Sequence, residues 1–361
     1  MTSLPEAQHA WESTFRTDPD GRPLAPLFHR LLMLDVVGTP TPDDVARLEG
    51  ALQSLEAEFP YGPDGLLTAL AWGPGWFERH TPLRRSPVGR PLPMARWENP
   101  VLEEIDACLH LAGDDEELLA DISGRLFGAS PLDQRTRLRL REVRTGFVGR
   151  GLPARRLPGA GLPRSAPLML GFHSGLRGNQ ADEDSITITE GPLAGGTTMH
   201  VSYLTLDLDS WYEQDADTRS GHMFSPRVSA EAAGKLVEDA RSDADDLPAT
   251  AASHGVVGHA QATGRARLNG RARINRRDFA TLDHGTPGTH FVSLQRTMED
   301  FHATRAVMNA ADAPSHHPAV GVRRRNGING FIEVRSRATF AVPPRGTRSF
   351  PYLSAPAPAT P

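Results

Sequence analysis

The residues that could do chemistry form none of the common catalytic or metal-binding motifs. The chain has no pair of CxxC motifs and no HExxH, GxxxxGK or GxSxG sequence, so the zinc, nucleotide and serine-hydrolase sites of those types are not predicted. The densest feature is the segment 265–277, which carries six arginines. Guanidinium groups suit an anionic ligand. Because no aromatic residues are interleaved, the run does not indicate base stacking, and a solvated charged face is the simpler interpretation.

The composition excludes several classes of protein. The 361 residues carry a formal net charge of −5, which disfavours a globally basic surface for nucleic acid. Cys108 is the only cysteine and lies in an apolar run, so we expect a buried, inert thiol and no intramolecular disulfide. No apolar stretch approaches the length of a membrane span, and the first 16 residues lack a signal-peptide pattern. We therefore expect a cytoplasmic protein with no nucleic-acid or membrane partner.

The elements that must position any site follow from hydrophobic spacing. In the first half, Thr41 and Pro42 are typical of a helix start, and apolar residues then recur every three or four positions until Pro60. Strands are predicted at residues 31–37, 66–72, 105–112 and 136–148, and helices at 41–59 and 114–127. The order is strand, helix, strand, followed by the same order again.

The second half repeats this pattern with larger insertions. Residues 149–167 hold four prolines and four glycines and read as the crossing between two domains. Strands are predicted at 168–172, 185–189, 197–208, 289–295 and 328–342, and helices at 229–240 and 297–309. We predict domains at 1–165 and 166–342, followed by a poorly ordered tail at 343–361, which is rich in Pro, Ala and Ser. The fold class is α+β, and a duplicated ferredoxin-like arrangement accommodates both halves.

The second half shows GFHSGL at 171–176, GGTTMHVSYLTLDLDSWY at 195–212, GHAQATGRAR at 258–267, INRRDF at 274–279 and FVSLQR at 291–296. In this order they resemble the dye-decolourising peroxidase (DyP-type) family of haem proteins. In the first half, segments 31–35, 65–77 and 106–111 are similar to the family's N-terminal domain. The resemblance implies two ferredoxin-like domains of the dimeric α+β barrel type, with haem b (iron protoporphyrin IX) bound mainly by the second.

The resemblance also assigns roles to single residues. His259 matches the proximal histidine, and a neutral imidazole is a suitable axial ligand for haem iron. His254 is the rival ligand, but the separation of His259 from Arg276 suits the family better. Arg276 matches the distal arginine, whose positive charge stabilises an anionic peroxide. A shift of one position would assign that role to Arg277 instead, for which a surface salt bridge is the alternative.

The distal glycine motif departs from the family pattern. The family has an aspartate where this chain has Ser174, within the sequence Gly171-Phe172-His173-Ser174-Gly175. A serine hydroxyl donates a hydrogen bond or orients water, but its very high pKa makes it a poor general base at neutral pH. His173 would supply a base if it faced the haem, although neighbours on a strand point to opposite sides. Phe172 is expected to contact the cofactor.

An acidic partner of the proximal histidine is the last residue role that we predict. A ligating imidazole usually donates its second N–H to a carboxylate. The family places an acid just beyond the strand that ends here in Arg296, and this chain offers Glu299 and Asp300 at the opening of a helix. We choose Glu299. The alternative is that both carboxylates only complement the positive end of that helix.

The function implied is a haem-dependent oxidoreductase that uses peroxide or a related oxidant on a small organic substrate. Arg276 would stabilise developing negative charge, and Ser174 would order water. The competing class is a non-catalytic haem carrier or sensor, which the missing distal acid favours. Whether the chain forms a homo-oligomer is left open by the sequence.

Overall fold

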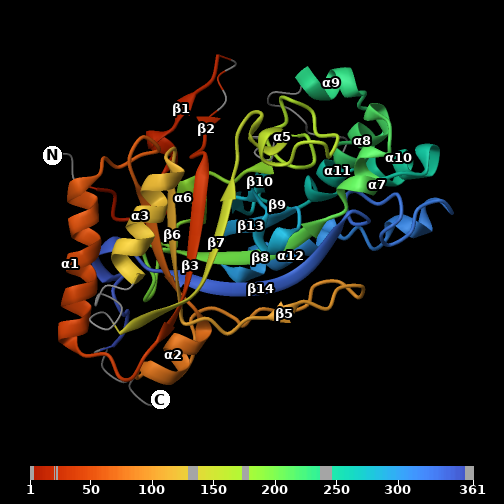
Figure 1. Cartoon of the computed structure of the whole chain (residues 1–361). Helices are drawn as coiled ribbons and strands as arrows, with labels where there is room; N and C mark the ends of the chain where they lie inside the picture. Colours follow the sequence, from red (N-terminus) through yellow and green to blue (C-terminus); the bar gives the residue numbers. More distant parts are fainter. Residues whose placement is uncertain are drawn as a thin grey trace, which may run out of the picture.

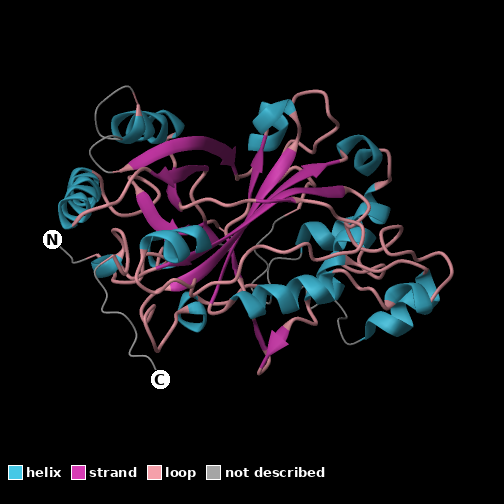
Figure 2. Cartoon of the chain, turned by 90° about the horizontal axis from the view of Figure 1, so that it is seen from below, coloured by secondary structure: helices cyan, strands magenta, loops and turns pink. Residues whose placement is uncertain are grey.

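The computed structural model describes residues 4–19, 21, 23–128, 137–172, 179–235 and 246–353. Its strands lie at the centre of the molecule and its helices around them (Figure 2). Within the described residues, no helix combines the length and the apolar character needed to span a bilayer.

The N-terminal half is a four-stranded antiparallel sheet with two helices. Along the chain it consists of β3 (Phe28–Val36), α1 (Pro42–Glu58), β4 (Leu67–Trp72), β6 (Ala107–Gly113), α3 (Glu116–Phe127) and β7 (Leu138–Phe147). The strand order is β4-β6-β3-β7. The two strands of each strand–helix–strand unit are thus separated by a third strand, which is the split βαβ arrangement of a ferredoxin-like fold.

The C-terminal half repeats this order with a long helical insertion. Its main elements are β8 (Thr197–Leu206), β11 (Asn275–Arg276), β12 (Phe279–Thr281), β13 (Gly288–Gln295), α12 (Met298–Met308) and β14 (Ile332–Val342). Both β11 and β12 pair with β13, β13 pairs with β8, and β8 pairs with β14. The predicted duplicated ferredoxin-like α+β fold is therefore confirmed.

The insertion and the connections contain shorter elements. Between β8 and β11 lie α7 (Leu208–Tyr212), α8 (Ala216–Met223), α9 (Ala230–Lys235), α10 (Leu247–His254), α11 (His259–Thr263), β9 (Arg267–Leu268) and β10 (Arg271–Ala272). Elsewhere are η1 (Glu12–Thr14), β1 (Arg16–Thr17), β2 (Pro23–Leu24), α2 (Pro74–His80), β5 (Val101–Leu102), α5 (Leu152–Arg156), α6 (Glu183–Ile186), η4 (Asp283–Gly285), η5 (Ala313–Ser315) and η6 (Arg345–Thr347). The insertion lies beside the C-terminal strands, away from α1 and α3 (Figure 1).

The two sheets join at both edges. One residue pair links β12 to β7, Ala280 with Phe147, and another links β14 to β4, Ala341 with Trp72. Strand periodicity then divides the core, because successive side chains point to opposite faces. Leu31 packs with residues of both sheets, whereas its neighbour Leu32 packs in the cluster that includes the apolar faces of α1 and α3. Both faces of β3 are therefore buried.

Most predicted elements are confirmed, but two strands are wrong. Residues 168–172 form turns and bends, and residues 185–189 begin in the short helix α6. Residues 168–172 are a short apolar run and residues 185–189 a short polar–apolar alternation. Five residues are too few for periodicity alone to assign a strand. The predicted helix at 229–240 is confirmed as α9 to Lys235, and residues 236–240 lie outside the described part of the chain.

The predicted tail is packed as far as the structure describes it. Phe350 is buried against Trp72 and Trp76. Arg348 is 1% exposed and bridges α1, with contacts of 2.9 Å to Glu49 and 2.5 Å to Glu56. Burial raises the pKa of Glu49, but hydrogen bonds and the positive charge of Arg348 more than offset this and leave that pKa below its ordinary value. Residues 343–353 therefore anchor the end of the described chain to the N-terminal half.

Replacing the buried arginine of this anchor should destabilise the fold. We expect Arg348→Gln to lower the free energy of unfolding by about 3 kcal/mol, because the partly buried Glu49 loses its arginine partner and Glu56 keeps only Arg345. Arg125→Gln, which removes an exposed ion pair between α3 and Glu58 of α1, should have little effect. Urea denaturation at pH 7 measures both, and equal stability of Arg348→Gln and wild type would contradict the anchor.

Candidate functional site

A large cavity lies on the outer face of the C-terminal sheet. It encloses about 1170 Å³, part of it continuous with solvent, and its wall is mainly apolar. Side chains of β8, β13 and β14 form its floor, and α8, α11 and α12 contribute its sides. Its polar lining residues are Asn179, Ser202, His259, Thr263, Arg276, Asp278, Thr289, Thr304, Arg305 and Arg337. A mainly apolar wall with a few convergent polar groups is typical of sites that bind a cofactor or another small molecule.

His259 is held in the wall of this cavity by two glycines. Gly258 is the N-cap of α11, and a Cβ there would lie 1.8 Å from the carbonyl oxygen of Phe224. Gly327 has a φ of +55°, and a Cβ there would lie 3.1 Å from the Cα of His259. A side chain at position 258 would therefore clash with the backbone, and one at position 327 would be strained by its positive φ and crowd His259. These two glycines let the backbone pack closely around His259.

The imidazole of His259 is neutral over a wide pH range. Burial lowers its pKa to about 3, and the positive charges of Arg276 and Arg305 lower it further in the same direction. Among the described residues the ring has no hydrogen-bond partner. It therefore presents a nitrogen lone pair that can bind a metal centre supplied by a ligand.

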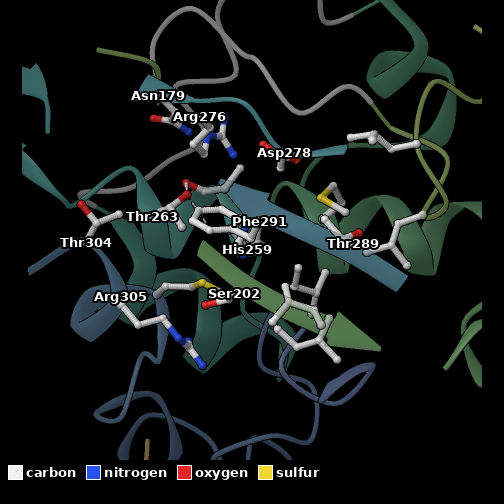
Figure 3. Close-up of a pocket in the computed structure, with 18 of the residues that line it drawn as sticks. Asn179, Ser202, His259, Thr263, Arg276, Asp278, Thr289, Phe291, Thr304 and Arg305 are labelled. Carbon is white, nitrogen blue, oxygen red and sulfur yellow. Dashed lines mark hydrogen bonds between the residues drawn. The ribbon is translucent and has the colours of Figure 1, made fainter. Parts of the chain in front are cut away.

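A guanidinium and a carboxylate lie together on another side of the cavity. Arg276 and Asp278 both line it, and they lie close together in Figure 3, with Arg305 on the opposite side. Burial lowers the pKa of Arg276, and the negative charge of Asp278 offsets part of this shift. Arg277, between them, points the other way and ion-pairs with Glu183 at 2.7 Å. The register of β11 thus selects Arg276 over its neighbour.

The other arginines of the run 265–277 bind partners within the chain. Arg273 ion-pairs with Asp300 at 2.9 Å, and Arg265 contacts Asp312 at 3.3 Å. Arg267 donates to the side chain of Asn179 at 2.8 Å, and exposed Arg271 is 4.0 Å from Asp182. The run is therefore neither a continuous anion-binding surface nor a solvated face, since Arg276 is its one cavity-lining member.

The remaining predicted site residues have mixed placements. Phe172 lines the cavity, and its ring makes an edge contact with Phe224. His254 is exposed at the end of α10 and does not line it. His173 and Ser174 lie outside the described residues.

The choice of Glu299 as the partner of His259 disagrees with the structure. Its side chain is 89% exposed and lies 3.7 Å from His302 on the same helix. Asp300, the alternative, is buried but ion-pairs with Arg273 and accepts a hydrogen bond from Thr297, the N-cap of α12. The helix-end interpretation accounts better for both acids, because they occupy the first turn of α12.

Three charged residues of the cavity were missed at the sequence level. The sequence spacing could have identified Asp278, because it lies two positions after Arg276 and strand residues at that spacing share a face. No sequence pattern indicated Arg305 or Arg337. They come from α12 and β14 and meet only through tertiary packing.

Comparison with known proteins gives a family but no established activity. The sequence profile of a family of unknown function, DUF7405, matches residues 26–344. The chain belongs to the DUF7405 family. No curated protein matches it.

This DUF7405 protein shares its fold with dye-decolorizing peroxidases. A dye-decolorizing protein from V. cholerae is 16% identical with a TM-score of 0.64, and the match covers 94% of this chain and 99% of that one. A dye-decolorizing peroxidase from Bacteroides thetaiotaomicron is 14% identical with a TM-score of 0.63 over 94% and 99% of the two chains. A Rhodococcus jostii DypB variant in complex with heme is 16% identical with a TM-score of 0.62 over 95% and 98%. At these identities the likeness establishes the fold alone.

The neutral state of His259 predicts a specific pH dependence. Its folded pKa of about 3 lies below the ordinary 6.5, so between these values the unfolded chain binds more protons and stability falls as the pH falls. We expect His259→Gln to make this decline shallower by up to about 1.4 kcal/mol per pH unit between pH 6 and 4.

Urea denaturation of the ligand-free protein across this range measures the slope. His254→Gln is the matched control, because that histidine is exposed and outside the cavity, and it should retain the wild-type slope. Identical slopes for all three proteins would mean that His259 protonates as readily in the folded chain as in the unfolded one.

Proposed function

We propose that the cavity binds haem, with His259 as the axial ligand of the iron, and that the protein is a peroxide-dependent oxidoreductase acting on a small organic substrate. The observation that carries this proposal is a neutral imidazole without a hydrogen-bond partner among the described residues, in the same cavity as Arg276 and Asp278. The DypB variant solved with heme has the same fold.

The chemistry of the wall fits such a cofactor. Apolar residues on β8, β13, α12 and the segment 168–172 match a porphyrin face, and arginines match the anionic carboxylates at its edge. His259 would supply the axial nitrogen. When bound, haem iron supplies the redox centre that accepts electrons from the substrate and delivers them to peroxide.

The chain's own residues would control charge and protons. The Arg276 guanidinium stabilises negative charge that develops on peroxide oxygen, because it keeps its proton despite burial. The Asp278 carboxylate accepts a proton from one peroxide oxygen and returns it to the other, so that the departing group leaves as water. Asp278 thus takes the acid–base role for which Ser174 is poorly suited.

The ligand assignment predicts different behaviour for two nearby histidines. His259→Ala should abolish or severely weaken haem binding, because it removes the axial nitrogen. His254→Ala should bind haem as the wild type does. Absorbance titration of the purified chain with haem measures both, and the reverse pattern would assign the ligand to His254.

The acid–base assignment predicts a kinetic defect without a binding defect. Asp278→Asn should lower kcat for peroxide-dependent dye oxidation by about 10²- to 10⁴-fold at unchanged haem affinity. Asp121→Asn, an exposed acid on α3, is the control and should leave kcat unchanged. Ser174→Asp, which supplies the family's acid, should restore part of the activity in the Asp278→Asn background. Full activity of Asp278→Asn would remove the residue from the mechanism.

A non-catalytic haem carrier or sensor is the second candidate, and one observation favours it. The charged neighbours that shift the pKa of His259 are Arg276 and Arg305, both cationic. A cationic environment makes an axial imidazole a weaker electron donor and disfavours the higher iron oxidation states. Stopped-flow mixing of the haem-loaded protein with peroxide separates the two candidates, because an enzyme changes its spectrum rapidly and a carrier does so slowly.

A further inference from the structure

One end of the cavity is built on a buried cluster of two arginines and one glutamate. Arg337 on β14 is 2.8 Å from Glu98, and Arg305 on α12 is 3.5 Å from the same carboxylate. The exposed fractions of the side chains of Arg337, Arg305 and Glu98 are 2%, 6% and 2%. Glu98 comes from the N-terminal half and precedes β5, which runs along β14 (Figure 1).

The cluster carries one positive charge more than its carboxylate neutralises. Burial lowers the pKa of His200 well below its ordinary value, and the charge of Arg337 acts in the same direction, so this imidazole is neutral. It accepts from Arg337 at 3.2 Å and stacks on Phe301. Burial lowers the pKa of Arg305 to about 10, since the attraction of Glu98 offsets only part of it and Arg337 adds repulsion.

Other buried arginines of the chain are matched differently. Arg144 contacts two carboxylates, Glu103 and Glu142, and Arg345 and Arg348 together contact two, Glu49 and Glu56. A buried charge without a counter-charge is costly unless something else neutralises it. In the cluster two guanidinium groups share one carboxylate, so one counter-charge is lacking among the described residues.

The unmatched charge faces the cavity. Both Arg305 and Arg337 line it, as does Ser202, which accepts a hydrogen bond from Arg337 at 2.9 Å. The buried Nε of Arg337 has no acceptor within the described part of the chain. A donor of this kind is available to an acceptor that enters with a ligand.

We propose that Arg305 and Arg337 form a subsite that binds a carboxylate group of the cavity's ligand. This subsite rests on the proposed function, because it requires that the cavity binds a ligand. The carboxylate has two sources, a propionate of the porphyrin or a small organic acid bound beside it. Glu98 holds the two guanidinium groups in place and leaves one charge for the ligand.

Two variants with opposite effects test the subsite. Arg337→Gln removes the excess charge and should weaken carboxylate binding roughly 10- to 100-fold, the loss of one charge-assisted hydrogen bond. Glu98→Gln raises the excess and should leave carboxylate binding equal to or tighter than wild type. A purely structural role predicts weaker binding in both, because both break the same ion pair.

The ligand pairs differ only in the carboxylate. Absorbance titration compares haem with haem dimethyl ester, and calorimetry compares 4-phenylbutyrate with 4-phenylbutanol on the haem-loaded protein. If the carboxylate is a propionate, Arg337→Gln loses affinity for haem but not for its diester. If the carboxylate belongs to a small acid, Arg337→Gln retains its preference for haem over the diester and loses affinity only for phenylbutyrate.

The remaining outcomes separate a failure of the carboxylate subsite from a failure of the proposed haem function. Equal affinities of Arg337→Gln and wild type for haem and for phenylbutyrate overturn the subsite. If the wild type takes up no haem, the proposed function fails. Calorimetry with 4-phenylbutyrate and 4-phenylbutanol on the ligand-free protein then still tests the subsite by itself. If Arg337→Gln does not fold, Glu98→Gln decides, and weaker binding of phenylbutyrate and haem by that variant overturns the proposal.

Discussion

The charge balance of one apolar cavity is the constraint on which the site depends. Among the described residues, Arg276, Arg305 and Arg337 contribute three guanidinium groups to its wall, and Asp278 contributes one carboxylate. Burial, together with the positive charges of Arg276 and Arg305, keeps His259 unprotonated, and the positive charge of the wall attracts anions. A neutral nitrogen donor and an attraction for anions are together what an iron porphyrin with peripheral carboxylates requires.

The cavity results from a structural difference between the two ferredoxin-like repeats. In the first, α1 and α3 pack closely on the sheet and the space between is filled by a continuous apolar core. In the second, the insertion from α7 to α11 lies between β8 and the β11–β13 region in sequence and carries His259. The sheet face that lines the cavity carries the polar side chains of Ser202 and Arg337 among its apolar residues. The same strand order thus yields a core in one half and a site in the other.

Much of this arrangement could be predicted from the sequence, for identifiable reasons. The spacing of Leu48, Leu52 and Leu55 specifies α1, because one buried helix face needs apolar residues every three or four positions. Local motifs also identified His259 and Arg276 as candidate site residues, both of which line the cavity. The site roles assigned to them stay predictions.

What the sequence could not supply depends on long-range packing. The segment after Pro343 has the composition of a disordered tail. In the structure, however, Arg348 ion-pairs with two acids on α1, some 300 positions earlier, and Phe350 packs against two tryptophans. Glu299 and Asp300 are adjacent in sequence, and only the packing of α12 decides that one is exposed and the other pairs with Arg273. Glu98 likewise meets Arg337 across 239 positions. No local sequence pattern predicts these long-range contacts.

The proposed bond between His259 and the iron of haem can be detected by resonance Raman spectroscopy of the ferrous haem-loaded protein. A bond between iron and imidazole gives a stretching band that shifts when histidine is labelled with ¹⁵N. We expect this band in the wild type, its loss in His259→Gly and its return when free imidazole is added to that variant. Haem bound with no such band in the wild type, or a band that persists in His259→Gly without added imidazole, would show that His259 is not the ligand.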